Sequence, residues 1–139
     1  MIHVATRAIQ ETFEEKGVKF RVKEVGDSSV VEAGFSIDNG PSVVVRFISP
    51  DDDNDVAIRI FELISVTEDK RASVQAALNK LNHKYRYLKF VMDDDGDVNV
   101  ENDLCLCTSN VGPVCFEIFA RAMQILDDAY PVLMRALWE

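Results

Sequence analysis

The run of acidic residues after Pro50 is the first pattern in this chain that could bind an ion. Asp51, Asp53 and Asp55 would occupy positions one, three and five of a helix-loop-helix calcium loop, with Glu62 at position twelve. Such a loop requires glycine at position six, but this chain has a valine there, and a strand pattern follows. We therefore interpret this segment as a solvated hairpin loop and predict no metal site.

A second acidic loop, over residues 93–97, surrounds Gly96. Placing Gly96 at position six of a calcium loop puts Val91 at position one and Asn102 at position twelve, so this match also fails. Such loops are usually solvated, and their charges also discourage strand ends from pairing with other chains.

Three cysteines could begin a zinc site or supply a nucleophile. Cys105 and Cys107 would share one side of a strand, and Cys115 opens the last predicted helix. The paired spacing of a zinc site is missing, and neither His83 nor His3 has an evident catalytic partner. We expect small, reduced core cysteines, no catalytic residue and no cofactor.

The elements that position these residues follow from apolar periodicity. Runs of strands joined by short turns imply an antiparallel sheet, and helices kept apart from them imply an α+β architecture. We expect one domain over residues 1–139, with five to six strands in the order α-β-β-β-β-α-β-β-α. The predicted helices cover residues 5–16, 67–85 and 113–138, and the predicted strands cover 19–25, 30–37, 42–49, 56–64, 88–92 and 98–104.

The strands over 42–49 and 56–64 are the most apolar, which is typical of central strands covered on both faces. Arg46 and Arg59, one in each strand, are the exceptions. They predict an exposed or paired position on one face of the sheet.

Parity constrains the last hairpin. Its apolar residues fall at even positions in both strands, so facing residues have an even sum and the loop must hold three or five residues. A three-residue loop over 94–96 fits, with Gly96 in the left-handed conformation. This loop would pair Met92 with Val98 and Phe90 with Val100.

The same stretch carries a family resemblance. Leu81-Asn82 at a helix end, Lys89-Phe90, the Asp-Asp-Asp-Gly turn, Glu101 and Asp103-Leu104 together resemble the YbjN family of bacterial sensory transduction regulators. The resemblance implies a fold similar to type III secretion chaperones, often dimeric, and it transfers no catalytic residue. Cys105 stands where family members usually have proline, which affects the expected loop geometry.

The net charge of −9 restricts the partners. Ten of the 24 acidic residues lie within residues 51–55 and 93–103, which leaves 14 acids against 15 bases elsewhere. No basic stripe is evident, so we expect neither a nucleic acid nor an anionic membrane as partner, although a basic partner stays possible. No segment resembles an export signal or membrane helix, and with three cysteines this favours a cytoplasmic setting.

The last helix is apolar around more than half of its circumference, and Pro131 should kink or break it near residues 127–130. A surplus apolar face marks an interface, and deep burial in one domain is the alternative. We expect a non-enzymatic, chaperone-like or regulatory protein-binding module, as a homodimer; the alternatives are a small enzyme or a divalent-metal-responsive protein. The candidate partner or dimer surface comprises Phe119, Met123, Leu126, Tyr130, Leu133, Leu137 and Trp138.

Overall fold

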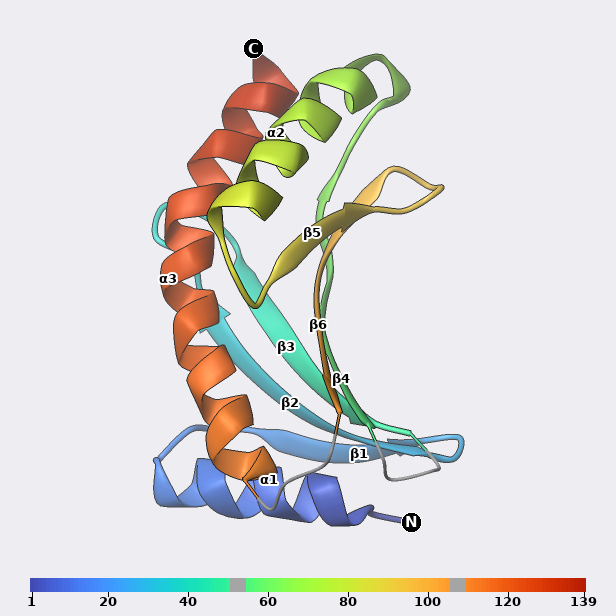
Figure 1. Cartoon of the computed structure of the whole chain (residues 1–139), viewed down its shortest axis with the longest axis vertical. Helices are drawn as coiled ribbons and strands as arrows, with labels where there is room; N and C mark the ends of the chain where they lie inside the picture. Colours follow the sequence, from blue (N-terminus) through green and yellow to red (C-terminus); the bar gives the residue numbers. More distant parts are fainter. Residues whose placement is uncertain (51–54, 106–109) are drawn as a thin grey trace.

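The computed structural model describes residues 1–50, 55–105 and 110–139. Within these ranges the chain has the predicted α+β element order, with one short 3-10 turn added before the second helix (Figure 1). The elements are α1 (Val4–Glu15), β1 (Arg21–Val25), β2 (Ser28–Ser36), β3 (Ser42–Ser49), β4 (Asp55–Ser65), η1 (Glu68–Lys70), α2 (Arg71–Lys84), β5 (Lys89–Met92), β6 (Asp97–Cys105) and α3 (Val111–Trp138).

The strands form one antiparallel sheet in the order β1-β2-β3-β4-β6-β5. β3 and β4 lie at its centre, as their apolar sequences predict. Figure 1 shows the helices against one side of the sheet, while the opposite side faces away from them. The expectation that β3 and β4 are covered on both faces is therefore wrong for the described residues. Val44 and Phe61 project from their second face and are exposed.

The β5–β6 hairpin has the predicted register. Met92 pairs with Val98 and Phe90 with Val100. Gly96 has a φ of 86°, and its N–H donates to the Asp93 carbonyl at 3.1 Å. Loop parity and one glycine therefore sufficed to fix the pairing of these two strands.

Aromatic rings join the sheet to α1 and α3. The Phe13 ring centroid lies 5.3 Å from that of Phe47 and 5.7 Å from that of Phe119, and all three rings are buried. Gly112 allows α3 to begin directly against α1, because a Cβ there would collide with the Thr12 hydroxyl and lie 2.6 Å from the Ala8 carbonyl oxygen. The start of α3 is thus fixed against α1.

The rest of α3 continues to Trp138 without a break, although Pro131 lies inside it. Of the two outcomes predicted near residues 127–130, the break is wrong, and the kink stays a prediction. Pro131 is on the exposed side of the helix, so water can bond the carbonyl that loses its donor. Within the described ranges, no helix combines the length and apolar character required to cross a membrane.

Candidate binding surface

Most of the partner surface predicted on α3 lies inside the core of the chain. Phe119, Leu126, Leu133 and Leu137 are only 2%, 0%, 0% and 8% exposed. The prediction that these four side chains contact a partner is therefore wrong, because the sheet together with α1 and α2 covers the wide apolar stripe of α3. The alternative interpretation, a helix buried within one domain, holds for them.

The other three residues of the predicted surface are more accessible. Met123 and Tyr130 are half-buried against the core, whereas Trp138 is 75% exposed near the end of α3. A contact of these side chains with a partner or a second copy stays a prediction.

The first acidic loop lies mostly outside the described residues, including Asp51 and Asp53. Asp55 begins β4, and Val56 directly after it is buried in the sheet. Glu62 lies at an irregularity of β4 with a φ of 52°. The segment from Asp55 onward is therefore a strand, as the sequence predicts.

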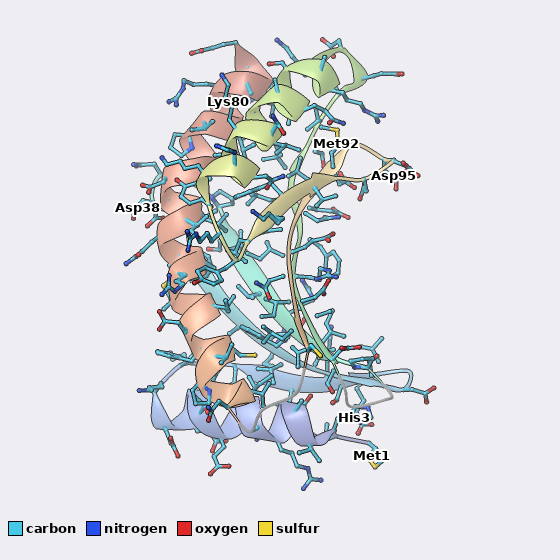
Figure 2. The ribbon with its side chains drawn as sticks, viewed as in Figure 1. Met1, His3, Asp38, Lys80, Met92 and Asp95 are labelled. Atoms are coloured by element: carbon cyan, nitrogen blue, oxygen red, sulfur yellow. The ribbon has the colours of Figure 1, made fainter. Side chains whose placement is uncertain are left out.

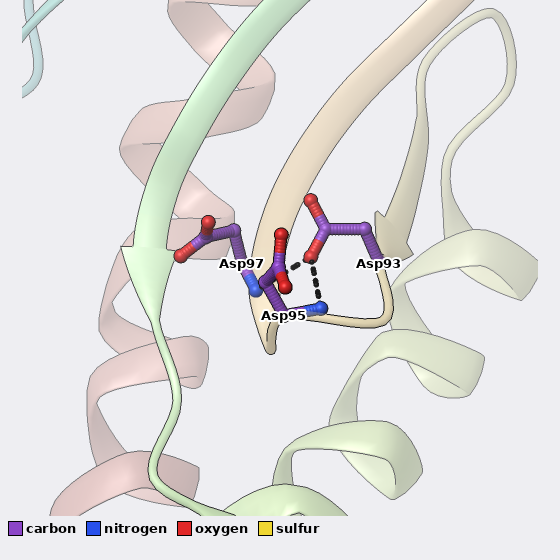
Figure 3. Close-up of side chains that lie close together, drawn as sticks. All are labelled: Asp93, Asp95 and Asp97. Atoms are coloured by element: carbon purple, nitrogen blue, oxygen red, sulfur yellow. Dashed lines mark hydrogen bonds between the residues drawn. The ribbon is translucent and has the colours of Figure 1, made fainter.

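The second acidic loop brings three carboxylates together. The nearest oxygens of Asp93, Asp95 and Asp97 lie within 4.8 Å of one another. Figure 3 shows that Asp93 Oδ1 accepts hydrogen bonds from the backbone N–H groups of Asp95 and Asp97, each at 3.0 Å. In Figure 2 the Asp95 side chain points outward at the tip of the hairpin. The Asp93 carboxylate therefore stabilises the turn by accepting hydrogen bonds from its backbone.

The candidate zinc ligands do not converge in the described part of the chain, where the Asp93 cluster is the one grouping of possible ligands. Cys115 is buried as predicted, and burial raises the pKa of its thiol to about 12. Cys105 is exposed, so its prediction as a core residue is wrong, and Cys107 lies outside the described residues.

His3 donates to the Asp27 carbonyl at 2.7 Å and ties the N-terminus to the β1–β2 turn. His83 is exposed on α2.

The face of the sheet turned away from the helices carries a row of charged residues. We call it the uncovered face. The register places one charged residue of each strand side by side, so the row crosses the whole sheet. In strand order its members are Arg21, Glu32, Arg46, Arg59, Glu101 and Lys89. The Lys89 ammonium turns to the end of α2, where it donates to the Asn82 and Tyr85 carbonyls.

Glu32 is the centre of this row. Its carboxylate lies 3.0 Å from Arg46, 3.2 Å from Lys23 and 3.5 Å from Arg21, and the residue is only 5% exposed. Burial raises the pKa of Glu32, but the Lys23 hydrogen bond and charge, with the charges of Arg46 and Arg21, outweigh it and lower the pKa overall. Three cations thus surround one concealed anion, which leaves this part of the face positive.

Arg46 and Arg59 face each other on adjacent strands, an arrangement of like charges that is normally destabilising. Each guanidinium turns to a different partner. Arg59 bonds Asp103 at 2.9 Å and two backbone carbonyls, while Arg46 bonds Glu32 and lies 5.8 Å from the Phe61 ring centroid. Of the two positions predicted for these arginines, exposed or paired, both residues have the paired one.

An apolar hollow adjoins the cations. It has a volume of about 270 Å³, and Lys23 and Arg46 stand among its lining residues. Its apolar part includes Phe61, which is 47% exposed. The remaining lining residues are Val25, Ser28, Val30 and Ile48.

Sequence reasoning missed this surface because its residues belong to six separate strands. Two signals were available: the paired arginines, and the alternation of Arg21 and Lys23 with apolar neighbours. Neither shows which strands are adjacent, and adjacency is what brings Glu32 between three cations.

Comparisons with known proteins agree with the fold. The YbjN family model, described as "Putative bacterial sensory transduction regulator", matches residues 7–133. The crystal structure of YbjN from E. coli, described as "a putative transcription regulator", matches with a TM-score of 0.55 and 13% identity. The match covers 90% of this chain and 90% of that chain, and at this identity it shows the shared fold. The search of curated proteins found no match.

Proposed function

Because this chain belongs to the YbjN family, we propose that it is a non-enzymatic regulatory binding module whose uncovered face docks an acidic polypeptide segment of a partner protein. The observation that carries the proposal is the cluster of Arg21, Lys23 and Arg46 around buried Glu32, beside the apolar hollow.

The charge that we expect of the partner follows from which charged side chains of the uncovered face are exposed. Glu32 is concealed, whereas the side chains of Arg21 and Lys23 are 82% and 48% exposed. A molecule that approaches β1–β3 therefore meets more positive than negative charge, although the chain as a whole carries −9. Complementary charge guides encounter and excludes partners of the wrong sign.

The dimensions of the surface favour a polypeptide. Neighbouring strands are about 4.8 Å apart, so the row from Arg21 on β1 to Glu101 on β6 crosses five strands and is about 19 Å long, which matches about six residues of extended chain. The hollow adds a place for one apolar side chain next to Phe61. We therefore expect the bound segment to combine acidic residues with one large apolar anchor.

Selection of random peptides from a display library on the immobilised full chain tests the proposal. Selected peptides should be rich in Asp and Glu around an apolar residue, and their affinity should fall as salt rises, because exposed charges are screened. Lys23→Gln should weaken binding by about two- to fivefold, the effect of one exposed ion pair. Phe61→Ala should weaken it by about tenfold, the effect of losing an aromatic anchor.

Matched controls lie on the helix side of the molecule. Arg135→Gln removes an exposed cation of α3 and Val114→Ala trims an exposed apolar residue of α3, so both should bind the selected peptides as the wild type does. Peptides without acidic bias, or equal losses in the control variants, would refute the proposal. Self-association through this face, with no peptide bound, would refute it as well.

A further inference from the structure

A pocket of about 370 Å³ lies between α3 and the connection from α2 to β5. Residues 84–87 form one wall, and α3 supplies Arg121 and Asp128 to the other. None of these residues belongs to the charged row of the uncovered face. Its volume lies within the range of small-molecule sites.

The pocket concentrates positive charge. Lys84, Arg86 and Arg121 line it together with one carboxylate, that of Asp128. Arg121 is partly neutralised by Glu117 at 2.9 Å, but Lys84 and Arg86 have no ion-pair partner within the described residues. In a chain of net charge −9, this local excess of cations favours an anionic ligand.

Tyr87 supplies an aromatic surface held at a conformational cost. Its φ is 72°, a left-handed conformation that costs a tyrosine on the order of 1–3 kcal/mol. The Asn102 side-chain amide donates to its carbonyl, and the Arg121 guanidinium lies 4.9 Å from its ring centroid. The ring is nevertheless 48% exposed, so the strained backbone presents it to solvent beside the cations.

The second tyrosine of the pocket has an unsatisfied polar atom. The Tyr85 hydroxyl is buried and has no hydrogen-bond partner within the described residues. Buried hydroxyls almost always have a partner, which an ordered water molecule can supply.

From these observations we propose that the pocket binds a nucleoside monophosphate. The base stacks on Tyr87, the phosphate lies among Lys84, Arg86 and Arg121, and Asp128 accepts hydrogen bonds from the sugar or base. Base stacking on an aromatic side chain is sequence-tolerant, so the class of ligand is specified and the identity of the base is not.

Titration of the full chain with four probes, followed by amide NMR shifts, tests this site. The probes are ribonucleoside 5′-monophosphates, ribose 5-phosphate, a nucleoside without phosphate, and inorganic phosphate. Monophosphates should bind at least fivefold more tightly than ribose 5-phosphate, since stacking contributes about 1–3 kcal/mol per base. The shifts should centre on residues 84–87 and the facing turns of α3.

Two variants separate binding from folding. Tyr87→Gly removes the ring and also relieves the positive φ, so it should abolish the preference for monophosphates while retaining or raising stability. Arg121→Gln should weaken monophosphate binding by about tenfold, as expected for one hydrogen bond to a charged group. Arg135→Gln changes an arginine of the same helix outside the pocket and should bind normally.

Three results would overturn the proposal. They are equal affinity for inorganic phosphate and monophosphates, wild-type binding by both pocket variants, and absence of binding by every probe. None of them bears on the display selection, which concerns the uncovered face, so the two proposals fail separately.

Discussion

Replacing Glu32 by glutamine tests the charge arrangement of the uncovered face most directly. Glutamine keeps the size of the side chain but removes the negative charge that Arg21, Lys23 and Arg46 share. The three cations then face one another without a counter-charge. We expect the free energy of unfolding to fall at neutral pH.

The size of the expected loss in the free energy of unfolding follows from how exposed the three cations around Glu32 are. Glu32 is buried, but the side chains of Arg21, Lys23 and Arg46 are 82%, 48% and 31% exposed, so water screens all three contacts. Exposed ion pairs contribute about 0.2–1 kcal/mol each. Glu32→Gln should therefore lower the free energy of unfolding by about 1–2 kcal/mol, less than the cost of breaking a fully buried pair.

The loss should depend on pH with a definite sign. Because the folded chain lowers the pKa of Glu32, the stabilisation is complete above the unfolded glutamate pKa of about 4.3 and disappears as the pH falls through the lower folded value. Urea denaturation followed by circular dichroism should thus give a difference between wild type and variant that is largest near neutrality. The difference should narrow in acid, where the wild-type carboxylate is also protonated.

Glu11→Gln is the control, since Glu11 is exposed on α1 and its substitution should change stability by less than about 0.5 kcal/mol. An unchanged stability of Glu32→Gln at neutral pH would show that the three contacts contribute nothing. A deficit of the same size at all pH values would show that packing, and not charge, is responsible.

Three further predictions concern stability and reactivity. Gly96→Ala should lower the free energy of unfolding by about 2 kcal/mol or more in urea denaturation, because its φ is 86° and the new Cβ would lie 2.7 Å from a carbonyl oxygen. Gly26→Ala also places alanine at a positive φ, but its Cβ would meet no atom within 4 Å, so it should cost about 1 kcal/mol. Leu133→Ala should cost about 2–5 kcal/mol in the same assay, whereas Trp138→Ala should change stability by less than about 0.5 kcal/mol. Cys115, whose pKa is raised to about 12, should resist iodoacetamide at pH 8 in the folded chain and react after unfolding, as mass spectrometry of its peptide would show.

The elements and the last hairpin could be predicted because their signals are local. Two strands with apolar residues at even positions and a glycine between them admit few registers, and Met92 pairs with Val98 as parity requires. Turn residues likewise marked the ends of β3, which begins at Ser42 and ends at Ser49 in both the prediction and the structure.

The charged row could not be predicted in the same way. Arg46 and Arg59 stood out in two apolar strands, but their partners, Glu32 and Asp103, come from other strands on either side. Sequence order does not reveal that β4 pairs with β6 and that β5 lies at the edge. Only this order makes the six charged positions neighbours.

The error about α3 has the same origin. One sheet cannot cover a helix that is apolar over most of its circumference. We therefore predicted that a second copy or a partner protein covers the rest of α3. The structure supplies the missing cover from two directions, with α1 packed on α3 near Gly112 and Ser73 of α2 bonded to the Ala136 carbonyl near its end. The buried stripe of α3 is therefore covered within the chain, whereas Phe61 and Val44 are exposed beside the arginines on the opposite side of the sheet. The acidic partner that we propose should therefore be sought on the strands.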